Sequence, residues 1–144
     1  MSRAAVLDSL KNDVTLTNLV AANNILVNPN LDGRPGNISP GAFLIIKWQE
    51  QEVSPVFFED TPRGPVILEV WAHYPAEKST DYVRLDNILL RVKRALTQLE
   101  DFPGADAYTV CCISFSGNSK DLRDPAMNTI SKYATFKVLS RPVS

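Results

Sequence analysis

The sequence predicts a single α+β domain, in which two helices cover one face of a mixed or mainly antiparallel sheet of about four to five strands. Two segments, 2–12 and 81–99, carry apolar residues at helical spacing, and several short segments are rich in β-branched and aromatic residues. Most strands are joined by hairpin-length connections, which favour antiparallel pairing. The predicted order over residues 1–144 is α-β-β-β-α-β-β, and this length suits one hydrophobic core.

The N-terminal segment predicts a helix that breaks once. Residues 2–12 place Val6, Leu7 and Leu10 on one helical face. Asp13 follows, and its carboxylate can cap a second short segment that contains Leu16, Leu19 and Val20. Residues 28–41 hold three prolines and three glycines among polar residues, so we expect an irregular connection there before the first strand.

Five strands are expected from β-branched and aromatic content, at 42–48, 54–58, 65–74, 107–116 and 130–140. In the third of these, Val66, Leu68, Val70, Ala72 and Tyr74 share one face. Simple alternation in the fourth sets Cys111, Ile113 and Phe115 against Tyr108, Val110 and Cys112. Both faces would then be apolar, and two helices cover only one face, so a neighbouring subunit is expected on the other.

The helix at 81–99 is the clearest element, and Ser79 or Thr80 is its expected N-cap. Its main apolar face points to the core. Val83 and Leu90 fall nearly opposite that face, beside Arg94, with Arg84 and Arg91 near them. A solvated charged face is one interpretation, but exposed apolar residues among arginines are typical of contact surfaces. We therefore expect charge reversal at Arg91 or Arg94 to weaken assembly while folding is kept.

Charge and cysteine content exclude several classes of function. The net charge is −1, which does not favour binding driven by nucleic-acid phosphates. The N-terminus has no apolar signal-peptide core, and no apolar run reaches the roughly 20 residues of a membrane span, so we expect a soluble protein. Cys111 and Cys112 are adjacent in a strand, and we expect two reduced, buried thiols, neither a disulfide nor a zinc site.

A hydrolase or ligand-binding domain is the alternative from another functional class. It would use His73, the only histidine, with Asp121 or Asp124 from the loop "SKDLRDPAMN". No nucleophile, phosphate-binding or calcium-loop motif accompanies these residues. We therefore expect His73 to be a strand-end residue at a surface or contact, and the loop to be a salt-bridged or capped connection between the last two strands.

The segments "LKNDVTLTNLV", "VILEVWAHYPAEKSTDYVRLDNILLRVKRAL" and "DLRDPAMNTISKYATFKVLSRP" together resemble tail-terminator proteins of long-tailed, non-contractile bacteriophages. The resemblance covers nearly the whole chain and rests on diffuse features: the strand around Glu69, Val70 and Trp71, a helix opened by Tyr82, and Asp124 before a closing strand that contains Tyr133.

The resemblance implies a structural virion protein at the head-tail junction, assembled in the host cytoplasm, without cofactor or enzymatic activity. Such subunits form a hexameric ring that caps the tail tube, stops its polymerisation and meets the head-completion or stopper protein, and DNA at most passes through the lumen. Another neck or minor tail protein of the same particle is the alternative within this class. The expected interface residues are Val83, Arg84, Leu90, Arg91, Arg94, Trp71, Phe57, Phe58, Arg63, Arg123 and Asp124.

Overall fold

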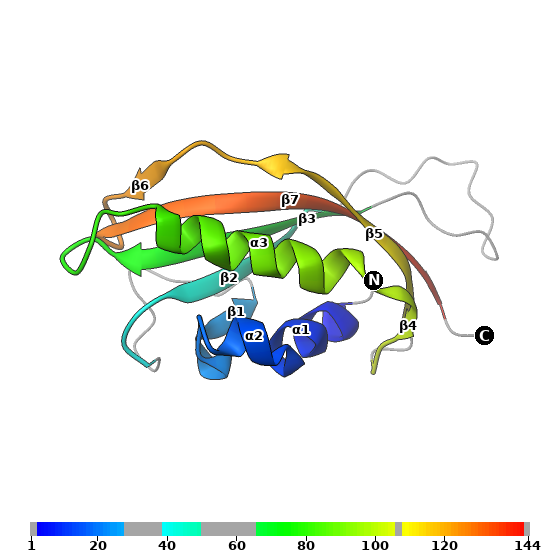
Figure 1. Cartoon of the computed structure of the whole chain (residues 1–144). Helices are drawn as coiled ribbons and strands as arrows, with labels where there is room; N and C mark the ends of the chain where they lie inside the picture. Colours follow the sequence, from blue (N-terminus) through cyan, green and yellow to red (C-terminus); the bar gives the residue numbers. More distant parts are fainter. Residues whose placement is uncertain (1–2, 28–38, 50–65, 106–107, 143–144) are drawn as a thin grey trace.

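The computed structural model describes residues 3–27, 39–49, 66–105 and 108–142, which form one curved sheet with helices on one of its faces (Figure 1). The helices are α1 (Arg3–Asn12), α2 (Val14–Thr17) and α3 (Val83–Thr97), with a 3-10 turn, η1, at Ala22–Asn24. The strands are β1 (Ile25–Val27), β2 (Phe43–Gln49), β3 (Val66–Pro75), β4 (Glu100–Pro103), β5 (Tyr108–Asn118), β6 (Leu122–Asp124) and β7 (Thr129–Pro142). No described helix is long and apolar enough to cross a membrane.

The sheet has seven strands among the described residues, and its order is β1-β2-β3-β7-β5-β4. β6 pairs with the first residues of β7, on the edge that β5 leaves after Asn118. Only the β1–β2 pair is parallel, so the sheet is mixed and the predicted α+β class is confirmed. The predicted strand number is too low, because β1, β4 and β6 have three or four residues each and are too short to show alternation.

The core lies between the sheet and the helices. α3 packs against β3, β5 and β7, and α1 packs against α3 and β1. The inward face of α3 follows the 3.6-residue period, as the sequence predicts. Its buried residues are Leu85, Ile88, Leu89, Val92, Ala95 and Leu96. They meet the inward side chains of the central strands, among them Leu68, Val70, Ala134 and Phe136.

The predicted break in the N-terminal helix is confirmed. α1 ends at Asn12, and the Asp13 carboxylate accepts a hydrogen bond from the backbone N–H of Leu16, which caps α2. The predicted start of the long helix is too early. α3 begins at Val83, and the N–H of Val83 donates to the carboxylate of Asp81. The hydroxyl of Ser79 accepts from the N–H of Asp81, so its hydrogen bond lies before the first turn of the helix.

The predicted facing of the strand expected at 107–116, which is β5 in the structure, is wrong because of a β-bulge at Cys111. The register shifts between Val110, which lies opposite Ser140, and Cys112, which lies opposite Leu139. The extra residue lets Val110 and Ile113 both face the core, which simple alternation forbids. Cys112 is exposed on the outer face and Cys111 is partly exposed, so the expected buried thiols are not found, although both are free.

The sequence predicts a neighbouring subunit over the outer face of the sheet because both faces of this strand would be apolar, and the bulge removes that argument for β5. Beyond Cys112, the outward residues of β5 are Ser114 and Ser116, both exposed. A second register shift lies between Phe115 and Gly117, and the positive φ of 142° at Gly117 is one that glycine adopts without strain. The outer face of β5 is therefore polar, and it presents no second apolar surface.

Phe136 provides a direct test of the core. Its ring is fully buried at the centre of β7 and tilts against Phe115 with ring centroids 5.6 Å apart. We expect Phe136→Ala to lower the free energy of unfolding by about 3–5 kcal/mol, because it removes the buried ring and leaves a cavity. Urea denaturation followed by circular dichroism measures the change. The control Val83→Ala, on the exposed side of α3, should change it by less than about 0.5 kcal/mol.

Candidate functional site

The outward side of α3 carries exposed apolar residues, as the sequence predicts. Val83, Asn87, Leu90 and Arg94 follow one another at spacings of four, three and four residues, which places them on one side of a helix. Val83 is 58% exposed and Leu90 is 47% exposed. We call these four residues the α3 stripe. It is a continuous surface of about three turns that the chain's own core does not use.

Two of the three arginines on α3 contact their own chain. Arg91 donates to both carboxylate oxygens of Asp13, at 3.0 Å from Nε and 2.8 Å from Nη2. Arg84 lies over the ring of Tyr74, 4.2 Å from its centroid. Within the part of the chain that the structure describes, Arg94 forms no hydrogen bond or ion pair. Charge reversal at Arg91 would also break this internal contact with Asp13, so Arg94 is the cleaner position at which to test the predicted contact surface.

Asp13 joins the N-terminal helices to α3. One of its oxygens accepts from both the Leu16 N–H and Arg91 Nε, and the other accepts from Arg91 Nη2. The bonds from Arg91 hold the pKa of the Asp13 carboxyl below its usual value, although burial acts in the opposite direction. This carboxylate therefore fixes where α2 lies against α3, and with it the position of Val14, which is 72% exposed.

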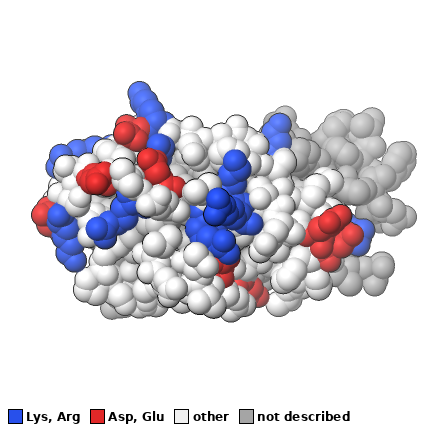
Figure 2. All heavy atoms as spheres, viewed as in Figure 1, with Lys and Arg blue, Asp and Glu red and all other residues white. Residues whose placement is uncertain are grey.

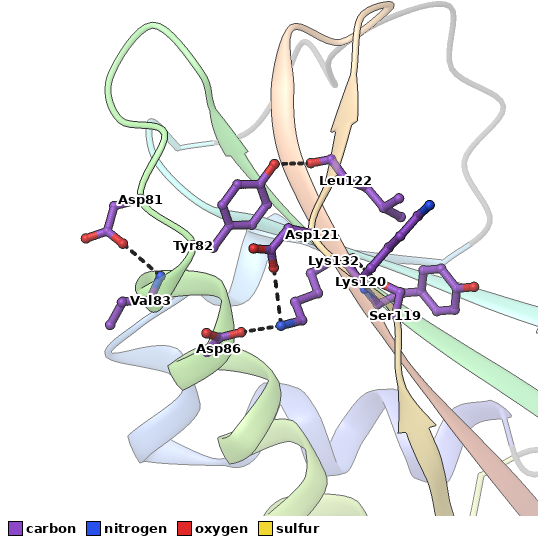
Figure 3. Close-up of polar contacts among 10 residues, drawn as sticks. Asp81, Tyr82, Val83, Asp86, Ser119, Lys120, Asp121, Leu122 and Lys132 are labelled. Carbon is purple, nitrogen blue, oxygen red and sulfur yellow. Dashed lines mark hydrogen bonds and ion pairs between the residues drawn. The ribbon is translucent and has the colours of Figure 1, made fainter.

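The loop at 119–128, which the sequence suggests as a catalytic cluster, is held in place by hydrogen bonds and ion pairs with neighbouring elements (Figure 3). Lys132 of β7 bonds to Asp86 of α3 at 2.7 Å and lies 3.4 Å from Asp121. The bond to Asp86 is the main reason that the pKa of Lys132 is raised. Close by, the Tyr82 hydroxyl donates to the carbonyl of Leu122 in β6. Asp121 thus helps to hold the β5–β6 connection against the start of α3.

The other charged residues of this loop shape the turn between β6 and β7. The carboxylate of Asp124 accepts from the backbone N–H of Met127, and Arg123 donates to the side chain of Asn128 at 3.3 Å. Asn128 has a positive φ of 50°, a conformation that asparagine tolerates. The expectation of a capped connection is confirmed, with the addition that it contains the short strand β6.

His73 is buried, and the expectation that it lies at a surface is wrong. Only 2% of it is exposed, and its ring stacks on Phe43 with centroids 4.9 Å apart. Its Nδ1 lies 2.9 Å from the Thr129 hydroxyl. Burial lowers the pKa of His73 to about 4, while Asp124 acts in the opposite direction and Lys47 adds to the lowering. At neutral pH the ring is therefore uncharged.

The residues of the acid-base alternative are not joined by hydrogen bonds, although Asp124 lies near enough to His73 to affect its pKa. None of the hydrogen bonds among the described residues joins His73 to Asp121 or Asp124, because the first carboxylate pairs with Lys132 and the second caps a turn. The described residues also contain no group of three or more His, Cys, Asp or Glu side chains that could hold a metal ion. The geometry therefore offers no support for catalysis by these three residues.

Trp71 lies on the outer face of the sheet, which faces away from the helices. Its ring stacks on Tyr133 with centroids 4.3 Å apart, and its Nε1 donates to Glu69. Lys47 lies over the same ring at 4.4 Å. The tryptophan is half-buried among these neighbours. Phe57, Phe58 and Arg63, as well as the expected strand at 54–58, lie outside the described residues.

A surface that the sequence reasoning missed lies at β4, the last strand of the sheet. All four of its residues are exposed, and Phe102 is 40% exposed. Glu100 and Asp101 precede this ring, and Asp101 lies 3.5 Å from Arg141 in a pair whose side chains are both more than half exposed. The sequence "EDFP" carries this signal, because it places two acids beside an aromatic residue directly after a helix.

Charges of opposite sign gather at separate places on the face that carries α3 (Figure 2). Basic side chains lie over the middle of α3, and a compact acidic group lies toward the end of the molecule where β4 ends the sheet. The basic residues of the second half of α3 are Arg91, Lys93 and Arg94. The two charged regions are therefore distinct surfaces of the same chain.

No protein-family model matches the sequence, and no curated protein is similar to it. Among solved structures, the fold matches a chain of the "Virion of native gene transfer agent (GTA) particle". The TM-score is 0.62 and the sequence identity is 15%, over 95% of this chain and 92% of that chain. At this identity the comparison establishes a shared fold, and that fold extends over nearly the whole of both chains.

The buried histidine makes stability depend on pH. Because the pKa of His73 is about 4 in the folded chain and near 6.5 when unfolded, the unfolded chain binds the proton first as the pH falls. We expect the free energy of unfolding to fall between about pH 6.5 and 4, by about 3 kcal/mol in total. Urea titrations at several pH values measure this loss. In His73→Phe the loss over the same interval should be much smaller, and an unchanged slope would contradict the assignment.

The Asp13 carboxylate is expected to have two separable roles. Asp13→Asn keeps a cap for α2 but loses the charge that faces Arg91, whereas Asp13→Ala loses both. We expect Asp13→Ala to cost about 1 kcal/mol from the cap alone, in addition to the lost contact with Arg91. Because the folded pKa of Asp13 is lowered, its contribution is complete above about pH 4 and is lost as the pH falls through the folded pKa. Acid unfolding of the two variants should start at a higher pH than in the wild type; coincident acid curves for all three chains would contradict this role.

Proposed function

We propose that this chain is a structural subunit of a phage-like particle, and that it forms a ring that caps the tail tube. The ring stops tube polymerisation and joins the tail to the head-completion or stopper protein. The observation that carries the proposal is the fold shared with a chain of a gene transfer agent virion, which covers 95% of this chain and 92% of the other. A match of that extent leaves little of either chain without a counterpart.

Two further observations support the terminator role within such a particle. The segments around Trp71, Tyr82 and Asp124 resemble tail terminators, and all three residues lie in or beside elements that the fold uses for its sheet and its main helix. The charged residues that offered a catalytic alternative make structural contacts instead. An assembly protein requires no buried reactive group, and it does require surfaces that remain available on the folded subunit.

The available surfaces suit assembly. A closed ring requires heterologous contacts, in which two different patches of each subunit meet. The α3 stripe and the exposed strand β4 are two such patches, because they differ in charge and in backbone structure. Near-neutral net charge agrees with protein partners, since binding to a nucleic acid would favour a clustered positive excess.

Assembly and capping can be measured separately. We expect the purified chain to form a discrete oligomer in mass photometry and to appear as a ring at one end of purified tail tubes in electron microscopy. Addition of the chain to polymerising tube protein should shorten the tubes. A monomer at all concentrations, together with bare tube ends, would contradict the proposal. A ring that binds the portal side of the neck and leaves tube length unchanged would instead identify another neck protein.

A further inference from the structure

The α3 stripe has the composition of a contact surface with a positive charge at one end. Val83 and Leu90 supply exposed aliphatic area, and Arg94 supplies a guanidinium group without an internal partner among the described residues. Val14 is a further exposed apolar residue, and the Asp13–Arg91 contact holds the residue before it against α3. An aliphatic surface next to a free arginine favours a partner that offers an apolar group beside a carboxylate.

The same chain presents that combination at β4, which we call the β4 edge (Glu100, Asp101 and Phe102). Phe102 is exposed, and Glu100 forms no ion pair with any described residue. Asp101 is in the left-handed region, with φ 48°, and lies between the paired residues Glu100 and Phe102, so the regular strand is interrupted at that point. Among the described residues, β4 is the last strand of the sheet, and no other described strand pairs with its second side.

Within one chain the two surfaces do not meet, because no ion pair joins Arg94 to Glu100 among the described residues. Only Gln98 and Leu99 separate α3 from β4, and Leu99 is buried in the core. β4 is also paired with β5, from Glu100 opposite Cys112 to Pro103 opposite Thr109. The strand is therefore held at the sheet edge, while the α3 stripe faces away from the sheet. A second copy of the chain can bring its β4 edge to this stripe.

We propose that the α3 stripe of one copy binds the β4 edge of the next copy, with Arg94 facing Glu100 and Leu90 packing on Phe102. This inference rests on the proposed ring and names its subunit contact. Because the two surfaces differ, an open assembly keeps one free stripe at one end and one free edge at the other, so the contact propagates head to tail until a ring closes. The opposite charges of Arg94 and Glu100 favour this stripe-to-edge contact over a stripe-to-stripe contact, in which like charges would meet.

Charge reversal at each surface tests the contact. Arg94→Glu and Glu100→Lys should each weaken self-association at least about tenfold by mass photometry, because each places like charges opposite one another. The double variant Arg94→Glu/Glu100→Lys should recover the ring, since the charges are exchanged and the pair is restored. Matched controls are Lys120→Glu and Asp8→Lys, two exposed residues on other elements, and these variants should assemble as the wild type does.

Mixing the two single variants tests whether the two surfaces pair with each other. In a 1:1 mixture, intact Arg94 meets intact Glu100 at one contact and the two exchanged charges meet at the next, so both contacts join opposite charges and the mixture should recover association with the two variants alternating. A mixture that stays monomeric would overturn the proposal, as would loss of assembly in the controls. Rings that persist in both single variants would overturn this contact and leave the ring function intact. A wild-type chain that never associates would overturn both.

Discussion

The packing of α3 across the middle of the sheet is the constraint on which the rest of the structure depends. Six side chains of this helix are buried, and the helix packs against β3, β5 and β7, which supply core residues such as Leu68, Ile113 and Phe136. Burial of a side chain of this size contributes about 1.5–3 kcal/mol, so this layer dominates the stability of the chain. With one side of α3 committed to the core, its opposite side must face solvent or a partner.

The other helices and the β5–β6 connection take their positions from α3. Asp13 holds the start of α2 against it through Arg91, and Lys132 with Tyr82 holds β6 near its first turn. These two sets of contacts include Arg91 and Asp121, which the sequence alone offers for a partner contact and for a catalytic site. In the folded chain their hydrogen bonds are directed inward, and the surfaces left over are the α3 stripe and the β4 edge.

This division between internal and external charges determines which arginine is available to a partner. Arg84, Arg91 and Arg94 are indistinguishable as arginines on one helix, yet two of them make intrachain contacts and the third makes none with the described residues. An ion pair on an exposed surface contributes little to stability, so a free Arg94 costs the folded chain almost nothing. The same group gains importance once a partner excludes water around it, because the attraction between charges then increases.

Residue spacing by itself determined much of this protein. The inward face of α3, the alternation of β3, the break at Asp13 and the exposed pair Val83 and Leu90 all follow from it, because helices and strands repeat their side-chain directions at fixed intervals. Only the tertiary structure decided where that repetition is interrupted or where distant residues meet. The bulge at Cys111 reverses the facing of the part of β5 that follows it. Arg91 binds Asp13, which lies 78 residues away in the sequence. Strands of three or four residues such as β4 form because neighbouring strands supply their hydrogen bonds, and that support is not encoded within the segment itself.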